Sequence, residues 1–434
     1  MKKRLLSLIS ALCIIISFSP STLAANLPEV DVRTEGLTPA QPQEAPAEKP
    51  RDAGAERRTI YVSNEGTEED DGATAETPTT LARATELANE GKKPVEIVVL
   101  GQVSVDTWTS PTVETTLRGG DENAELLFEY CSASDGAYNI SLADALTIDD
   151  IKFNCNYTDY FFSRYYGTYT IVANGYPLVI ASGVQCSYYT ADTIVDGKTC
   201  STSSCYVIGG GLDEDITGGT HVEIYTSLPL TYVYGGGVNG SVESNVYLHI
   251  ENCGKIQHVR AGGYANKKDA KVNGNITLDF INSVTDNPIY GGGYARSSYS
   301  AEVTGSICIN LSGLNNGFGR PIYGGGYGKN APVVGNIRFN ISNTKMNNNA
   351  AAIYGGGYNS DVTGDIFIHI KENSLISEET VWGGGTGDST ITGGVTITVD
   401  DSTEVIGEIR AGGNEGADVI GDVDGLAQLA VGDA

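Results

Sequence analysis

The chain has 434 residues, and its 27 basic residues stand against 54 acidic ones, which gives a formal net charge of −27. This balance excludes nucleic acid and anionic membranes as main partners, because both require a cationic face. Glycine accounts for 55 residues, well above the usual share of about 7%, and it follows no collagen period. With 40% hydrophobic residues, the chain is not disordered overall, so the glycine surplus indicates a special architecture.

The first 24 residues have the layout of a secretory signal peptide. Positive residues at 2–4 precede an apolar core at 5–18, and small side chains lie before the expected cleavage after Ala24. The alternative is a membrane anchor, but serines interrupt this core, which is short for a bilayer span of about 20 residues. Residues 25–58, rich in Pro, Ala and Glu, are expected to form a disordered linker. We predict a secreted product without membrane insertion, located outside the cell or on its surface.

The folded part is expected to begin with a strand around 60–62. An acidic loop follows, and then a short helix with Thr77 as N-cap and Pro78 at its first position. Its apolar stripe would consist of Leu81, Ala84, Leu87 and Ala88. Gly91 should end this helix, and residues 95–100, rich in β-branched side chains, predict a strand.

This order resembles the opening of secreted right-handed parallel β-helix proteins of the pectin-lyase-like class. In these proteins an IYV…DG…TP…TL…A segment leads into the first rung, and its helix covers the open end. Residues 115–120, 145–153 and 171–180 look like successive early rungs. The resemblance implies an all-β, right-handed parallel solenoid with a short N-terminal capping helix. Its expected parts are a cap with irregular rungs (59–206), a repeat region (207–421) and a C-terminal end (422–434).

A glycine cluster, Gly-Gly-Gly or Ala-Gly-Gly, recurs eight times. The clusters begin at Gly209, Gly235, Ala261, Gly291, Gly324, Gly355, Gly383 and Ala411. Regular recurrence of this kind, at 26 to 33 residues, is typical of a solenoid. Each repeat holds two strand-like segments with alternating apolar residues and no long helix between them, which excludes a βαβ sheet. A β-propeller blade requires four strands in about 40–45 residues, more than one repeat provides.

Alignment of the repeats predicts columns of side chains along the solenoid. One inward column contains Val233, Val259, Ile289, Ile322, Ile353, Val381 and Ile409. The other contains Val222, Val246, Ile276, Ile307, Ile337, Ile366 and Val395. An outward column on the second strand contains Tyr225, His249, Asp279, Asn310, Asn340, His369 and Thr398. Its two histidines lie several rungs apart, so we expect surface residues there and not a metal pair.

Aromatic residues flank the glycine clusters and form the candidate ligand site. The column before the clusters reads Tyr234, Arg260, Tyr290, Tyr323, Tyr354, Trp382 and Arg410. The column after them reads Tyr264, Tyr294, Tyr327 and Tyr358. If the glycine strand is extended, these columns lie roughly 13 Å apart, with bare backbone between them. Two interpretations stay open: tyrosines that stabilise one another over a tight bend, or a platform for sugar rings.

The middle repeats are the longest, and their inserts are expected to form a ridge beside the tyrosines. These inserts are 282–288, 312–321 and 342–352. Insertions on one face of a solenoid often carry binding. Their many asparagines suit sugar hydroxyls, although polar surface loops without a ligand are the alternative.

An enzyme of the β-helix class is the second hypothesis, because that class contains polysaccharide lyases and glycoside hydrolases. A hydrolase requires paired carboxylates, and a lyase requires calcium-binding acids beside a base. Asp213, Glu214 and Asp215 could bind calcium or form a plain acidic turn, and calcium is not predicted. The Gly-His-Gly and Arg-Ile-Lys motifs of polygalacturonases are absent from the sequence. We therefore predict no catalytic residue, no metal site and no cofactor.

Seven cysteines would remain after signal cleavage, an odd number that cannot all pair within one chain. Cys200 and Cys205 flank a short Ser/Thr loop and form the candidate disulfide. No CxxC pair occurs, which argues against zinc.

The repeats resemble the tandem YGGG repeats of exported, adhesin-like β-helix proteins of Gram-positive bacteria. This resemblance covers residues 207–421 and implies a binding protein of the cell surface. Such proteins commonly carry a wall-sorting signal, and none is recognised here, which leaves attachment to the cell open. We expect a non-catalytic binder of a glycan or an extracellular protein on the tyrosine face. The alternatives are a carbohydrate-active enzyme and a structural spacer, and the oligomeric state stays open.

Overall fold

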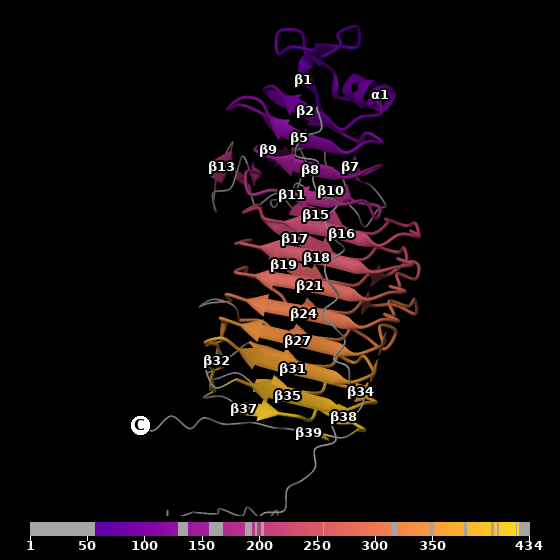
Figure 1. Ribbon diagram of the computed structural model, residues 1–434, viewed down its shortest axis with the longest axis vertical. Coiled ribbons are helices and arrows are strands. Elements are labelled where there is room, and N and C mark those ends of the chain that lie inside the picture. The colour runs from indigo at the N-terminus through magenta and orange to yellow at the C-terminus, as the bar shows by residue number, and fades with distance from the viewer. Residues whose placement is uncertain are drawn as a thin grey trace, which may run out of the picture. The chain divides into compact units, whose positions relative to one another are not determined.

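The computed structural model describes residues 57–128, 138–155, 168–186, 193–195, 198–200, 204–254, 256–314, 319–346, 351–376, 380–400, 403–405, 408–421 and 423–424. All of them belong to the unit Asp52–Ala434. Within this unit the strands form a parallel β-solenoid, which confirms the predicted all-β fold class (Figure 1). The predicted signal peptide and nearly all of the predicted linker lie outside the described residues.

The largest sheet, called the main sheet, contains 13 parallel strands, each paired with the strand of the next rung. In order they are β1 (Arg58–Thr67), β2 (Val95–Val99), β5 (Thr115–Gly119), β8 (Leu146–Asp149), β11 (Leu178–Ile180), β16 (Thr220–Ile224), β18 (Val246–Glu251), β21 (Ile276–Ile281), β24 (Ile307–Ser312), β27 (Ile337–Ser342), β31 (Ile366–Lys371), β35 (Val395–Val399) and β39 (Val423–Asp424). The predicted early rungs around 115–120, 145–153 and 171–180 each contribute a strand to it.

A second sheet holds the eight strands that precede the glycine clusters and three strands of the early rungs. Its 11 strands are β4 (Trp108–Thr109), β7 (Ile140–Ser141), β10 (Thr168–Val172), β15 (Ser204–Ile208), β17 (Leu230–Tyr234), β19 (Ile256–Arg260), β22 (Ile289–Tyr290), β25 (Ile322–Tyr323), β29 (Ala352–Tyr354), β33 (Thr380–Trp382) and β37 (Glu408–Arg410). Each rung therefore crosses from the main sheet to the second sheet, bends at the glycines and returns to the main sheet.

Smaller parallel sheets occupy the corners between these two sheets. One contains β3 (Gln102–Val105), β6 (Glu125–Phe128), β9 (Lys152–Cys155) and β12 (Gln185–Cys186). Two more contain β26 (Val333–Val334), β30 (Val362–Thr363), β34 (Thr390–Ile391) and β38 (Asp418–Val419), and β28 (Lys345–Met346), β32 (Leu375–Ile376) and β36 (Glu404–Val405). β20 (Tyr264–Ala265) pairs with β23 (Tyr294–Ala295), while β13 (Thr193–Val195) and β14 (Lys198–Cys200) pair antiparallel.

The solenoid interior is a continuous apolar core. In β24, Ile307, Ile309 and Leu311 are buried while the residues between them are half-exposed. The same alternation recurs in neighbouring strands, and each fully buried aliphatic side chain contributes roughly 1.5–3 kcal/mol. The predicted inward columns are confirmed, except at one rung. There Thr220 pairs with Val246, and Glu223, not Tyr225, pairs with His249.

This error is a register shift of two residues in β16. Val222 was aligned with Val246, but it pairs with Leu248. A shift by two keeps an apolar residue pointing inward, because side chains on a strand alternate with period two. The apolar pattern alone therefore could not distinguish the two registers.

The capping helix α1 (Leu81–Gly91) ends where predicted, but it begins later. Its N-cap is Thr80, whose side chain accepts a hydrogen bond from the backbone N–H three residues on. The predicted N-cap, Thr77, is wrong because it lies in a turn at 74–77 and the helix cannot begin before Thr79, which is fully buried and bridges to Thr67. The predicted stripe of Leu81, Ala84, Leu87 and Ala88 is confirmed as its buried face. Figure 1 shows α1 beside the first strands, at the end of the solenoid that β1 begins.

The backbone bends sharply at each glycine cluster. A Cβ on Gly292 would lie 2.8 Å from the backbone N of Gly326 and 2.9 Å from the carbonyl C of Gly325, in the next rung. The backbone of the next rung thus occupies the space that a side chain at this position would need. Two clusters have alanine at their first position, and the methyl group of Ala261 packs into the apolar core.

Candidate functional site

The side chains that flank the glycine clusters form two columns, and their register is as predicted. The first column runs through Tyr234, Arg260, Tyr290, Tyr323, Tyr354, Trp382 and Arg410, each paired with the next. The second column runs through Tyr264, Tyr294, Tyr327 and Tyr358. Because parallel strands in register stack like residues above one another, the columns follow from the repeat.

The predicted gap between the columns is wrong. The ring centroids of Tyr290 and Tyr294 lie only 5.4 Å apart, with their planes at 74°. Tyr323 and Tyr358, which belong to successive rungs, also meet edge to face, at 5.9 Å and 84°. The prediction assumed an extended glycine strand, whereas the bend at the glycines folds the second column back onto the first. No bare backbone floor separates the two columns.

In the middle rungs the rings of each column stack face to face, whereas Tyr264 and Tyr294 at the start of the second column meet edge to face at 64°. Tyr323 lies between Tyr290 and Tyr354, at 5.1 and 4.9 Å with nearly parallel planes. Tyr327 lies between Tyr294 and Tyr358, at 4.2 and 5.2 Å. Their faces are therefore covered by neighbouring rings, and a ligand would meet ring edges and hydroxyl groups.

Arg260 breaks the first column with a buried cation. The side chain is 5% exposed, and its guanidinium lies over four tyrosine rings, closest to Tyr294 at 3.5 Å from the centroid. One guanidinium N–H donates to the Tyr234 hydroxyl at 3.2 Å. The Nε atom is buried and has no hydrogen-bond partner among the described residues. Burial also raises the pKa of Tyr234, so this hydroxyl stays protonated.

The two last members of the first column are more open. Trp382 stacks on Tyr354 at 6.4 Å, and the Arg410 guanidinium lies 4.6 Å from the Trp382 ring centroid. Arg410 also pairs with Glu408 of its own strand. Unlike Arg260, this second predicted arginine is therefore exposed and neutralised.

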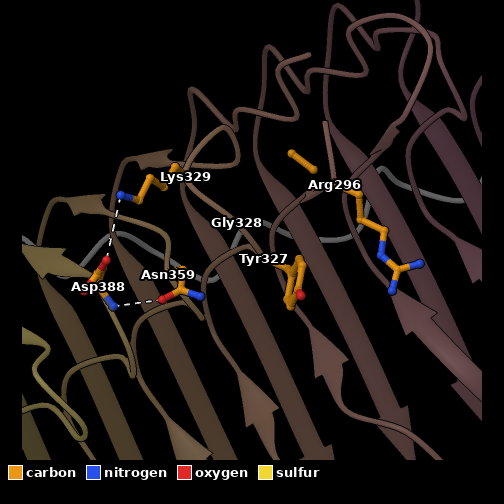
Figure 2. Close-up of a pocket in the computed structure, with 7 residues that line it drawn as sticks. Arg296, Tyr327, Gly328, Lys329, Asn359 and Asp388 are labelled. Atoms are coloured by element: carbon orange, nitrogen blue, oxygen red, sulfur yellow. Dashed lines mark hydrogen bonds and ion pairs between the residues drawn. The ribbon is translucent and has the colours of Figure 1, made fainter. Parts of the chain in front are cut away.

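An open groove of about 600 Å³ lies beside the second column and is called the ladder groove. It is lined by Ala295, Arg296, Tyr327, Gly328, Lys329, Asn359 and Asp388. In Figure 2 the Tyr327 ring stands between Arg296 on one side and Lys329, Asn359 and Asp388 on the other. Four successive rungs contribute to it, so it extends over roughly 14 Å along the solenoid axis.

The polar side chains of the ladder groove differ in the contacts that hold them. Lys329 Nζ lies 3.8 Å from an Asp388 carboxylate oxygen, and both side chains are largely exposed. Asn359 accepts a hydrogen bond from the Asp388 backbone N–H at 2.8 Å, which fixes the amide. Arg296 lies over the Tyr294 ring at 5.8 Å. The groove thus presents both donors and acceptors around an aromatic edge.

Of these lining residues, only Tyr327 belongs to the columns predicted from the sequence. The others follow the second column by one or two positions in their rungs, and this regular offset could have identified them. The described parts of the predicted inserts lead from the main sheet to the second sheet, before the first column. Several of their asparagines lie outside the described residues.

A second polar cluster, called the main-sheet network, lies on the outer face of the main sheet. His249 contacts Asp279 at 3.4 Å and Glu251 at 3.2 Å. Asp279 also accepts hydrogen bonds from Tyr247 at 2.9 Å and from Asn310 at 2.6 Å. The predicted outward column thus forms a hydrogen-bonded chain across rungs, and not isolated surface residues.

Burial and hydrogen bonding shift the pKa values of this network in opposite directions. Burial alone would lower the pKa of His249, but hydrogen bonds to Asp279 and Glu251 outweigh it and raise that pKa. Burial would raise the pKa of Asp279, but donors from His249, Asn310 and Tyr247 hold it below its usual range. Glu223 in the neighbouring rung also has a lowered pKa, chiefly through its hydrogen bond with His221. Both carboxyl groups are therefore ionised at neutral pH.

The acidic turn at 213–215 bonds to the next rung. Asp213 accepts from the Asn239 amide at 2.9 Å, and Asp215 from the Ser241 backbone N–H at 2.7 Å. Across the described residues, no group of three or more His, Cys, Asp or Glu side chains is arranged to hold a metal ion. The side chain of Cys200 lies outside the described residues, so the Cys200–Cys205 disulfide stays a prediction.

The described residues define the class of this protein, a repeat protein with a parallel β-solenoid fold. Within that part of the chain, no helix is long and apolar enough to cross a membrane. No family model, no curated protein and no solved structure matches the chain. The ladder groove and the main-sheet network are the features that bear on function.

Proposed function

We propose that this protein is an exported glycan-binding solenoid that holds its ligand in the ladder groove. One observation carries the proposal: Tyr327 lies in an open groove that also offers Arg296, Lys329, Asn359 and Asp388. A carbohydrate presents many hydroxyl groups, which bind best where donors and acceptors alternate around an apolar edge. The predicted signal peptide supports export to a compartment where such ligands occur.

The proposal differs in geometry from a stacking platform. Since both faces of Tyr327 are covered, the ligand would contact the ring edge and the phenol hydroxyl. Contact would extend along several rungs, because the lining residues repeat along the solenoid axis. An elongated saccharide fits such a groove better than a single compact sugar.

A glycan array probed with the mature chain tests the proposal. We expect binding that falls about tenfold in Tyr327→Ala, the loss typical of a central contact residue. Tyr327→Phe keeps the ring stack and removes only the hydroxyl, so a smaller loss of roughly two- to tenfold is expected. Tyr176→Ala serves as the control, because that tyrosine is 40% exposed and lies outside the groove. Binding to no glycan, or equal binding by all variants, would contradict the proposal.

A second candidate function is catalysis on a polysaccharide at the main-sheet network. Glu223 and Asp279 flank His249 and lie two rungs apart, or about 9.6 Å between backbones, near the separation in inverting hydrolases. Such an enzyme needs one protonated carboxyl group, however, and both carboxyl pKa values are lowered. Release of reducing or unsaturated sugar ends, abolished in Asp279→Asn, would favour the enzyme over the binder.

A further inference from the structure

Two arginines near the ladder groove have no carboxylate partner among the described residues. Arg260 donates only to a tyrosine hydroxyl, and its Nε is buried without a partner. Arg296 is exposed and contacts the face of Tyr294. By contrast, Arg57, Arg83, Arg118 and Arg410 each pair with a glutamate. Arg338 likewise has no ion pair among the described residues, so what distinguishes Arg260 and Arg296 is that both lie at one aromatic ring beside the ladder groove.

Both guanidinium groups lie around the same aromatic ring. Their central carbons are 3.5 Å (Arg260) and 5.8 Å (Arg296) from the Tyr294 centroid. The positive field here acts on His258, which stacks on Tyr232 at 4.4 Å. Burial lowers the pKa of His258 to about 4, and Coulombic repulsion from Arg260 and Arg296 adds to this shift. The surroundings of Tyr294 are thus locally cationic.

The acidic charge of the whole chain does not cancel this local field. At physiological ionic strength the Debye length is about 8 Å, so distant exposed carboxylates are largely screened. Lys329 at the opposite end of the groove is already paired with Asp388. Arg296 is therefore the groove cation that is available to a ligand, among the described lining residues.

We propose that the ladder groove binds an anionic saccharide, with a sulfate ester or a carboxylate of the sugar seated on Arg296. Guanidinium matches both groups with two parallel N–H donors, which makes such contacts stronger than neutral hydrogen bonds. Arg260 lies too deep to be the main contact, and it acts through its field and by holding Tyr294 in place. This inference rests on the proposed glycan binding and adds the class of ligand.

Three hexasaccharides test the inference by calorimetry with the mature chain. They are chondroitin sulfate, its desulfated form, which keeps the uronate carboxylates, and chitohexaose, which is neutral. We expect at least one charged probe to bind more tightly than chitohexaose. Arg296→Gln should weaken that charged probe by about ten- to a hundredfold and change chitohexaose binding less than twofold.

Two further variants distinguish the charge of the Arg296 side chain from its planar shape, and both from the general effect of removing an arginine. Arg296→Lys keeps the charge but loses the planar fork, so affinity for the charged probe should fall by less than in Arg296→Gln. Arg338→Gln is the matched control, because Arg338 also lies over an aromatic ring, Phe367, at 5.0 Å on another face. The sulfated and desulfated probes distinguish the sulfate ester from the carboxylate as the bound group.

The outcomes distinguish the inference from the proposed function. Equal affinity for charged and neutral probes, or an affinity for the charged probe that Arg296→Gln leaves unchanged, would overturn the anionic ligand. The proposed groove binding would still stand if Tyr327→Ala lost saccharide binding. Binding of neither charged probe would overturn the inference as well. Loss of discrimination in Arg338→Gln would also overturn it, because that arginine is remote from the groove. Thermal unfolding of each variant verifies that the solenoid is intact.

Discussion

Replacement of Gly292 by alanine tests whether the glycine clusters exist because adjacent rungs pack backbone against backbone. A Cβ at this position would lie 2.8 to 3.0 Å from three backbone atoms of Gly325 and Gly326. None of these atoms belongs to a flexible side chain, so the rungs themselves would have to separate. Overpacking of this kind costs about 1–3 kcal/mol. Restricting the unfolded chain by a Gly→Ala change returns only about 0.4–1 kcal/mol, so Gly292→Ala should lose about 1–2 kcal/mol.

Urea unfolding followed by circular dichroism measures this loss. Gly254→Ala is the matched control, because a Cβ there meets nothing within 4 Å. The control should be as stable as the natural chain or slightly more stable. If Gly292→Ala and Gly254→Ala unfold at the same urea concentration, the close-packing argument is refuted. The bend would then require another cause, and so would the contact between the two aromatic columns.

Three other predictions concern the column, the cap and the network. Tyr323→Ala should lower the free energy of unfolding by about 3–5 kcal/mol, since the ring is 6% exposed between two neighbours; a loss below 1 kcal/mol in urea unfolding would contradict this. Thr80→Ala should cost about 1 kcal/mol and Thr77→Ala almost nothing, because only Thr80 caps α1; equal unfolding midpoints would oppose that assignment. The raised pKa of His249 means that its protonated form stabilises the fold below pH 6.5, and this contribution disappears as the pH rises through the raised value. The lowered pKa of Asp279 has the opposite effect: its ionised form stabilises the fold above the ordinary value of 3.8, and this contribution is lost as the pH falls through the lowered pKa. In NMR titration Asp279→Asn should lower the pKa of His249, and an unchanged value would contradict the network.

The repeat made much of the fold predictable. Because equivalent residues of a solenoid stack one rung apart, aligning the glycine clusters was enough to place Tyr290, Tyr323 and Tyr354 in one column. The alternation in β24 and its neighbours likewise predicted the buried faces. The same pattern misaligned Val222, because a shift of two leaves the apolar face unchanged. The spacing from the glycine clusters, 11 positions from Gly209 to Thr220 and from Gly235 to Val246, carried the correct register.

The candidate site was less predictable, because it depends on the direction in which the chain turns at the glycines, which the spacing of residues in the sequence does not reveal. Three glycines separate Tyr290 from Tyr294, and an extended strand would keep their rings far apart. The bend brings the rings to 5.4 Å and covers their faces. The start of α1 was missed for a related reason, since Thr79 is held by a bridge to a distant strand.

The sequence by itself determined that this chain is a β-solenoid of glycine-marked rungs and which residues share each column. Tertiary structure alone decided the angle at the glycines, the burial of Arg260 among tyrosines and the groove around Tyr327. The physical reason is that periodicity determines which residues are neighbours along the solenoid axis. The angle between strands within a rung is set by how closely the backbones of successive rungs can approach. The glycine surplus allows that approach, and it thereby replaces the expected floor of bare backbone with a packed aromatic ladder and a polar groove beside it.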